Sequence, residues 1–126
     1  LPAFCRHHAA RAQAGLPSAR VFLLGGESGV APRAMEAINR RVGQPLVVGA
    51  LSPSMRFADD PDEIQGAIEA IQACGADTLV VGLGAPKQER WIMHHRARLP
   101  DVRRFLAVGG AIAFEAGTAQ RAPRWM

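Results

Sequence analysis

Residues 77–91, DTLVVGLGAPKQERW, contain the pattern that decides the fold. Asp77 to Gly82 predicts a strand, and Arg20 to Leu24, an apolar run without polar alternation, predicts one that is buried on both faces. A glycine-containing loop, Leu83 to Lys87, follows the strand that ends at Gly82. A helix is then predicted over Gln88 to Leu99, because Pro100 disfavours helical backbone just before it. A buried strand followed by a helix is the repeating unit of a parallel α/β sheet.

Three further apolar runs of strand length occur at Arg20–Leu24, Leu46–Val48 and Arg104–Val108. Each of the four predicted strands ends at a glycine, namely Gly25, Gly49, Gly82 and Gly109. Glycines at such places can simply form tight strand-to-helix turns. Because the carboxyl ends of parallel strands form the ligand-binding edge of an α/β sheet, we favour a glycine rim around a ligand.

Helical patterns alternate with these strands. Leu1 to Ala14 predicts one helix, and the apolar stripe Val30, Ala34 and Ile38 predicts a second that Gly43 ends. Asp60 is the predicted N-cap of a third, with Pro61 in the first turn, Glu63 completing a capping box, and Ile64, Ala67, Ile68 and Ile71 facing the core. The order predicts one α/β domain over residues 1–126, a Rossmann-like parallel sheet of about four strands with flanking helices.

Composition narrows the class of protein. Of the 126 residues, 48% are hydrophobic and 21% are charged, which is typical of a soluble globular domain. No apolar run is long enough to span a membrane and no signal peptide is evident, so we expect a cytoplasmic protein. The net charge of +4 raises the question of nucleic-acid binding, but the arginines alternate with acidic residues and lack a partnering aromatic platform. We therefore expect anionic substrates or an anionic membrane face, and no nucleic acid.

Several other functions are disfavoured by the residues. Gly25 to Gly29, GGESG, does not follow the GxGxxG pattern, and no acidic residue ends the second strand, which argues against a dinucleotide cofactor. Cys5 and Cys74 match no metal or redox spacing and are expected to be small buried apolar residues. The pairs His7-His8 and His94-His95 are expected at exposed helix positions, with no metal site.

The segment Lys87-Gln88-Glu89 enters a helix at its positive end, where polar groups can bind an anion and hydroxyls together. Lys87 is the sole lysine in a chain whose other basic side chains are arginines. A compact ammonium beside a phosphate explains that exception, so Lys87 and Gln88 are predicted site residues with side chains outside the core. Glu89 is equally compatible with substrate binding and with stabilising the helix dipole.

The run GLGAPKQERW, with VFLLGG upstream and VGGA and AG…RAPRW downstream, resembles the WecG/TagA/CpsF family of bacterial glycosyltransferases over about Arg20 to Met126. The resemblance implies sugar transfer from a UDP-sugar to a polyprenyl-pyrophosphate-linked saccharide, at the cytoplasmic face of the membrane, in cell-surface polysaccharide synthesis. It implies Lys87 and Gln88 as catalytic residues, Gln88 being the better match to an active-site residue of the family. The substrate-binding residues it implies are Gly25, Gly26, Gly82, Gly84, Ala85, Pro86, Lys87, Gln88, Glu89, Gly109, Gly110 and Ala111.

The chain also departs from the family pattern. The family's catalytic base is an Asp in a region expected before Leu1, and a membrane-docking appendage is expected after Met126, so the chain is expected to be truncated at both ends. Ala113 stands where the family usually has Asp, and residues 51–57 replace a glycine-aromatic stretch. The leading hypothesis is a metal-independent, inverting glycosyltransferase core without a cofactor. The alternatives are a non-catalytic nucleotide-binding or degenerate fragment of the same fold, and an NAD-dependent oxidoreductase.

Overall fold

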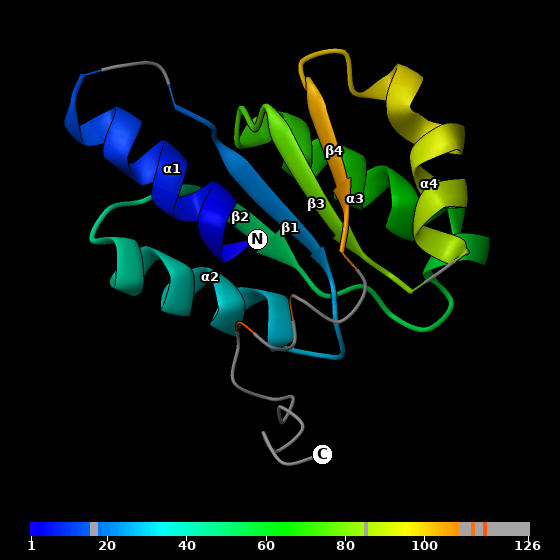
Figure 1. Cartoon of the computed structure of the whole chain (residues 1–126). Coiled ribbons are helices and arrows are strands. Elements are labelled where there is room, and N and C mark those ends of the chain that lie inside the picture. The colour runs from blue at the N-terminus through cyan, green and yellow to red at the C-terminus, as the bar shows by residue number, and fades with distance from the viewer. Residues whose placement is uncertain (16–17, 85, 109–111, 113–114, 116–126) are drawn as a thin grey trace.

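A four-stranded parallel sheet forms the centre of the molecule in the computed structural model (Figure 1). The structure describes residues 1–15, 18–84, 86–108, 112 and 115. The strands are β1 (Val21–Gly25), β2 (Val47–Leu51), β3 (Thr78–Gly82) and β4 (Arg104–Ala107). The helices are α1 (Pro2–Gln13), α2 (Val30–Val42), α3 (Pro61–Ala73) and α4 (Lys87–His95), with short 3-10 turns at Phe57–Asp59 and Arg96–Arg98. This architecture confirms the predicted Rossmann-like α/β fold.

The strand order β2-β1-β3-β4 creates a change of direction in the middle of the sheet. From β1 the chain passes through α2 to β2 at one edge, then returns through α3 to β3 and proceeds through α4 to β4 at the other edge. The loops that leave β1 and β3 therefore diverge to opposite sides. In open α/β sheets, ligands bind at such a topological switch point, beyond the carboxyl ends of the strands.

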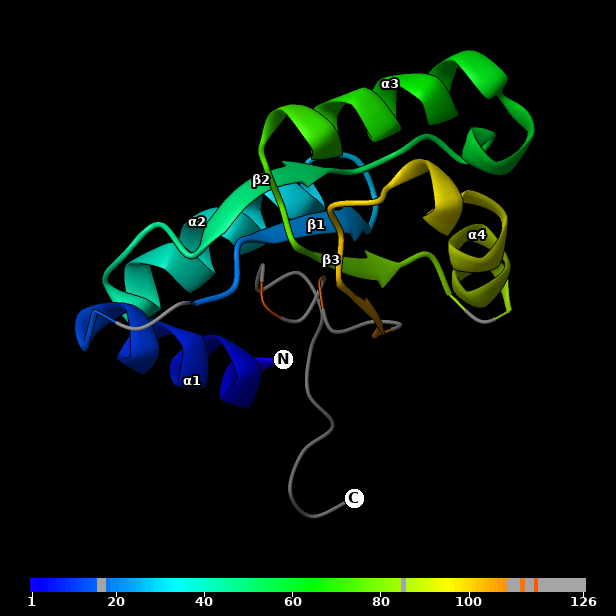
Figure 2. The ribbon, with the colours of Figure 1, turned by 90° about the horizontal axis from the view of Figure 1, so that it is seen from above.

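Helices cover both faces of the sheet (Figure 2). Phe22 and Leu24 of β1 pack in one cluster with apolar residues of α3 and α4, whereas Val21 and Leu23 pack in another with residues of α1 and α2. Successive strand residues point to opposite faces, so a strand between two helical layers is apolar throughout. This accounts for the absence of polar alternation in β1 and β3.

Helix α3 has the predicted start, with one difference. Asp60 is its N-cap and accepts hydrogen bonds from the backbone N–H groups of Asp62 and Glu63. The predicted capping box is wrong, because the Glu63 carboxylate accepts hydrogen bonds from the backbone N–H and the hydroxyl of Ser54, both at 2.6 Å. Glu63 thus ties the preceding loop to α3 rather than completing the cap. The helix predicted to run to about Leu99 is an α-helix only to His95 and continues as a 3-10 turn over Arg96–Arg98.

We expected Gly49 to end its strand. It lies inside β2 instead, and the strand continues to Leu51. A Cβ atom at Gly49 would lie 2.7 Å from both the Phe22 ring and the Cys74 Sγ atom. The glycine is therefore needed for close packing against β1 and the end of α3, not for a turn. Gly109 lies outside the described residues. The glycine-ended strands that the structure shows are β1 and β3, at Gly25 and Gly82.

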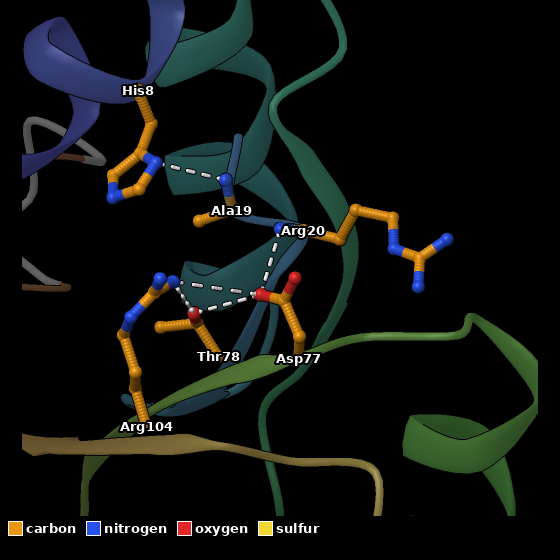
Figure 3. Close-up of polar contacts among 6 residues, drawn as sticks. All are labelled: His8, Ala19, Arg20, Asp77, Thr78 and Arg104. Carbon is orange, nitrogen blue, oxygen red and sulfur yellow. Dashed lines mark hydrogen bonds and ion pairs between the residues drawn. The ribbon is translucent and has the colours of Figure 1, made fainter. Parts of the chain in front are cut away.

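His8 is a further correction, because it is buried rather than exposed on α1. Its Nδ1 atom accepts a hydrogen bond of 2.9 Å from the backbone N–H of Ala19, just before β1 (Figure 3). Burial, and next the positive charge of Arg104, lowers the pKa of His8. The imidazole is therefore neutral at neutral pH and joins α1 to the sheet. Cys5 of α1 is fully buried as expected, whereas Cys74 is partly exposed.

A polar network closes the amino ends of the strands near His8 (Figure 3). Asp77 accepts hydrogen bonds of 2.9 Å from the backbone N–H of Arg20 and from the Thr78 hydroxyl. The Arg104 guanidinium donates to the Thr78 hydroxyl at 3.2 Å and lies 3.9 Å from the Asp77 carboxylate. This network links β1, β3 and β4 at the edge opposite the switch point.

Candidate active site

A cleft of about 1440 Å³ opens at the carboxyl edge of the sheet. One arm lies at the switch point and is lined by Gly26, Glu27, Ser28, Val30, Ser52, Gly82, Leu83, Gly84 and Ile112. The other arm lies between α4 and residues 53–63, and is lined by Pro53, Ser54, Met55, Phe57, Ala58, Glu63, Lys87, Arg90, Trp91, His94 and His95. These are called the switch-point arm and the α4 arm below. Their combined volume exceeds that of most small-molecule pockets.

The two glycines at the strand ends bring β1 and β3 together under the switch-point arm. Gly25 and Gly82 are register partners, and a Cβ atom on Gly25 would lie 2.4 Å from the carbonyl oxygen of Gly82. The backbone N–H of Gly26 donates to that same oxygen at 3.3 Å. Gly25 is thus fixed by strand packing and does not line the cleft, whereas Gly26 and Gly82 do.

The first turn of α2 has no N–H group left for an anion. Val30 donates to the carbonyl of Glu27, Ala31 to the hydroxyl of Ser52 and Arg33 to the carbonyl of Gly29, while Pro32 has no N–H. The Ser52 hydroxyl occupies the place that a phosphate takes at other helix starts. The N–H groups of the first turn of α2 are therefore already bonded within the protein.

Helix α4 provides the charged wall of the α4 arm. Lys87, Arg90, Trp91, His94 and His95 recur at spacings of three and four residues, so they share one face of the helix, and all five line the cleft. Sequence reasoning selected only Lys87 from this face. The helical spacing of Arg90 and His94 after Lys87 could have indicated this face, but from the sequence we expected His94 and His95 at exposed helix positions. His94 is exposed and His95 is partly buried, and both face the cleft.

Aromatic packing fixes the inner part of the α4 wall. The Phe57 and Trp91 rings stack with centroids 5.8 Å apart, and Trp91 contacts the His95 ring at 4.9 Å. The Nε1 atom of Trp91 and the Nδ1 atom of His95 are buried and have no hydrogen-bond partner among the residues that the structure describes. Burial, followed by the charges of Arg98 and His94, lowers the pKa of His95. His95 is therefore neutral at neutral pH.

The other predicted site residues divide into three groups. Gly84 lines the cleft with a φ of +83° and nothing within 4 Å of a Cβ position, so the glycine meets a conformational need and leaves open space for a ligand. Pro86 is the N-cap of α4, and Glu89 is exposed outside the cleft lining. Ala85, Gly109, Gly110, Ala111 and Ala113 lie outside the described residues.

Gln88 differs from expectation because it is buried, with 6% of its surface exposed, and it does not line the cleft. Its Nε2 atom donates to the Glu89 carboxylate at 3.3 Å. Within the described part of the chain, His, Cys, Asp and Glu side chains form no group of three that could hold a metal ion. No helix in that part is long and apolar enough to cross a membrane.

Comparison with known proteins identifies the family of this chain. Residues 1–126 match the Glycosyl transferase WecG/TagA/CpsF family. The chain is 32% identical over 108 residues to the N-acetylglucosaminyldiphosphoundecaprenol N-acetyl-beta-D-mannosaminyltransferases of Staphylococcus aureus strains MRSA252 and NCTC 8325 / PS 47. Each alignment covers 82% of this chain and 38% of the relative, so the chain spans well under half the length of these relatives. The match over its whole length shows that the chain belongs to the WecG/TagA/CpsF glycosyltransferase family.

Proposed function

We propose that this chain is the nucleotide-sugar-binding core of a glycosyltransferase. It transfers a sugar from a UDP-sugar to a polyprenyl-pyrophosphate-linked saccharide in cell-surface polysaccharide synthesis. The observation that carries the proposal is the cleft at the carboxyl edge of the sheet, which Lys87 lines from the first position of α4. The activity for which the relatives are named, an amino-sugar transfer to a diphosphate-linked acceptor, supports this proposal. A lipid-linked acceptor supports a peripheral position of the enzyme at the membrane surface.

Lys87 is the residue proposed to act on the leaving group. When the sugar is transferred, negative charge accumulates on the UDP diphosphate. Lys87 is exposed at the first position of α4, so its ammonium and the positive end of the helix act on the same anion. A charge positioned before the reaction stabilises the transition state without reorganising the site. Gly84 lets the diphosphate approach the loop backbone, because no side chain lies in that space.

The experiment compares Lys87→Ala, Lys87→Arg and Gln88→Ala by calorimetric titration with UDP. Loss of a charge-assisted phosphate contact costs about 1.5–3 kcal/mol, so Lys87→Ala should weaken UDP binding at least about tenfold. Lys87→Arg should restore it incompletely, because the guanidinium is bulkier and forked. Arg33→Ala, an exposed α2 residue outside the cleft, is the control and should bind like the parent.

Gln88 tests the catalytic role that the resemblance implies. If Gln88 acts on substrate, Gln88→Ala should lower the rate of sugar transfer by the full-length enzyme. That loss, expressed as a free energy, should exceed the loss in the free energy of unfolding. If all three Lys87 and Gln88 variants bind UDP and turn over like the parent, the loop is a structural turn and the proposal fails.

A further inference from the structure

We propose that Arg90 and His94 of the α4 arm bind the diphosphate of the acceptor, separately from the donor diphosphate at Lys87. This inference rests on the proposed function and adds the place of the second substrate. Both side chains line the cleft. Arg90 forms no ion pair with any acidic residue in the described part of the chain. An unpaired guanidinium in a cleft is a suitable partner for a phosphate, which it can bind through two parallel hydrogen bonds.

The spacing along α4 separates the two anions. At 1.5 Å per residue, His94 lies about 10 Å further along the helix axis than Lys87, with Arg90 between them. In a transfer between two diphosphate-linked sugars, the donor diphosphate leaves from one side of the reacting carbon. The acceptor hydroxyl enters from the other side, and its own diphosphate lies beyond the acceptor sugar ring. The two diphosphates must therefore be at least one sugar ring apart, a separation that matches the distance from Lys87 to His94, with Arg90 one turn nearer to Lys87.

The opposite walls of the cleft differ in charge and support this placement. Glu27 lines the switch-point arm, where its carboxylate disfavours a second phosphate nearby. Glu63 lines the α4 arm, but its two carboxylate oxygens are occupied by the backbone N–H and hydroxyl of Ser54. The positive charge of the α4 arm thus comes from its helix, through Lys87 near the start of α4 and Arg90 one turn further along.

The aromatic stack behind Arg90 and His94 keeps this wall rigid. Trp91 is 4% exposed and packs between Phe57 and His95, so the helix face cannot rotate without breaking the core. His95, kept neutral by its lowered pKa, adds no charge of its own.

The test uses the parent chain and three variants, Arg90→Ala, His94→Ala and the double variant. The probe is N-acetylglucosaminyl diphosphate esterified to a short alkyl chain, titrated into protein saturated with UDP. The double variant should bind this probe at least about tenfold more weakly. Its affinity for UDP should change less than about twofold. Arg33→Ala and His7→Ala, exposed residues outside the cleft, are the matched controls and should change neither affinity.

Each other outcome overturns the inference. If the parent chain does not bind the probe, or the double variant binds it normally, the α4 arm is not the acceptor site. If UDP binding falls as much as probe binding, Arg90 and His94 belong to the donor site. If the variants lose only binding to vesicles of phosphatidylglycerol and phosphatidylcholine, the pair contacts the membrane and not the acceptor. In all these cases a loss of UDP binding in Lys87→Ala would still support the proposed function, so the two failures are distinguishable.

Discussion

The buried imidazole of His8 makes a sharp prediction about stability and pH. The backbone N–H of Ala19 donates to Nδ1, so the ring proton lies on Nε2. Burial, and then Arg104, lowers the pKa in the folded state below the usual 6.5. As pH falls below about 6.5, the unfolded chain takes up a proton that the folded chain resists. The stability present above pH 6.5 is therefore lost as pH falls toward the folded pKa.

The magnitude follows from the hydrogen bond and from proton linkage. Between the unfolded and folded pKa values the free energy of unfolding should fall with a slope approaching about 1.4 kcal/mol per pH unit from this group. His8→Leu leaves the buried N–H of Ala19 without an acceptor, which should cost about 1–3 kcal/mol at pH 7.5. His8→Asn places Oδ1 where Nδ1 lies and does not titrate. It should therefore lose less stability than His8→Leu.

Urea denaturation followed by circular dichroism, from pH 5 to 8, provides the assay. His95 also has a lowered pKa, so the informative quantity is the difference between the parent and His8→Asn at each pH. That difference should shrink as pH falls below 6.5. A constant difference, or a His8→Leu variant as stable as His8→Asn, would refute the role assigned to the imidazole.

Three further predictions concern the cleft and its supports. Gly25→Ala should lower the free energy of unfolding, measured by chemical denaturation, by more than about 2 kcal/mol, because its Cβ atom would overlap the backbone of Gly82. Gly43 has a φ of +75° but open space around its Cβ position, so Gly43→Ala should lower the same free energy by about 1–2 kcal/mol. Equal costs would contradict the close contact between the strands. Glu63→Ala removes the charged hydrogen bonds to Ser54 and should lower the free energy of unfolding by about 1.5–3 kcal/mol. Glu69→Ala, on the exposed side of α3, should lower it by less than about 0.5 kcal/mol. In calorimetry UDP should bind more tightly than NAD, and equal or tighter NAD binding would contradict a nucleotide-sugar site.

Much of the fold could be predicted because each element carries its own local signal. The apolar strands β1 and β3 and the capped helix α3 depend on periodicity and on Asp60, which are visible in the sequence. Gly49 was misinterpreted because a glycine needed for packing against Phe22 looks the same as one in a turn. His8 was misplaced because its partner, the N–H of Ala19, lies outside its own helix.

The candidate site was predictable only in part for a similar reason. Lys87 and Gly84 belong to one continuous motif, so the sequence indicated them together. The rest of the α4 arm depends on the loop after β2 folding against α4, where Phe57 stacks on Trp91. No local pattern encodes that contact between distant segments. Gln88 was expected to face substrate, whereas its side chain turns into the protein beside Glu89.

The burial of Cys5 gives the chain an internal reporter of motion. Its thiol is fully covered in α1, and its pKa is raised by burial and next by the charge of Glu115, so the reactive thiolate is both scarce and inaccessible. Cys74 is partly exposed and can be blocked first in the native protein. A thiol reagent added afterwards would modify Cys5 only in molecules whose first helix has detached. The labelling rate would then measure the local opening equilibrium of that helix directly, without unfolding the sheet.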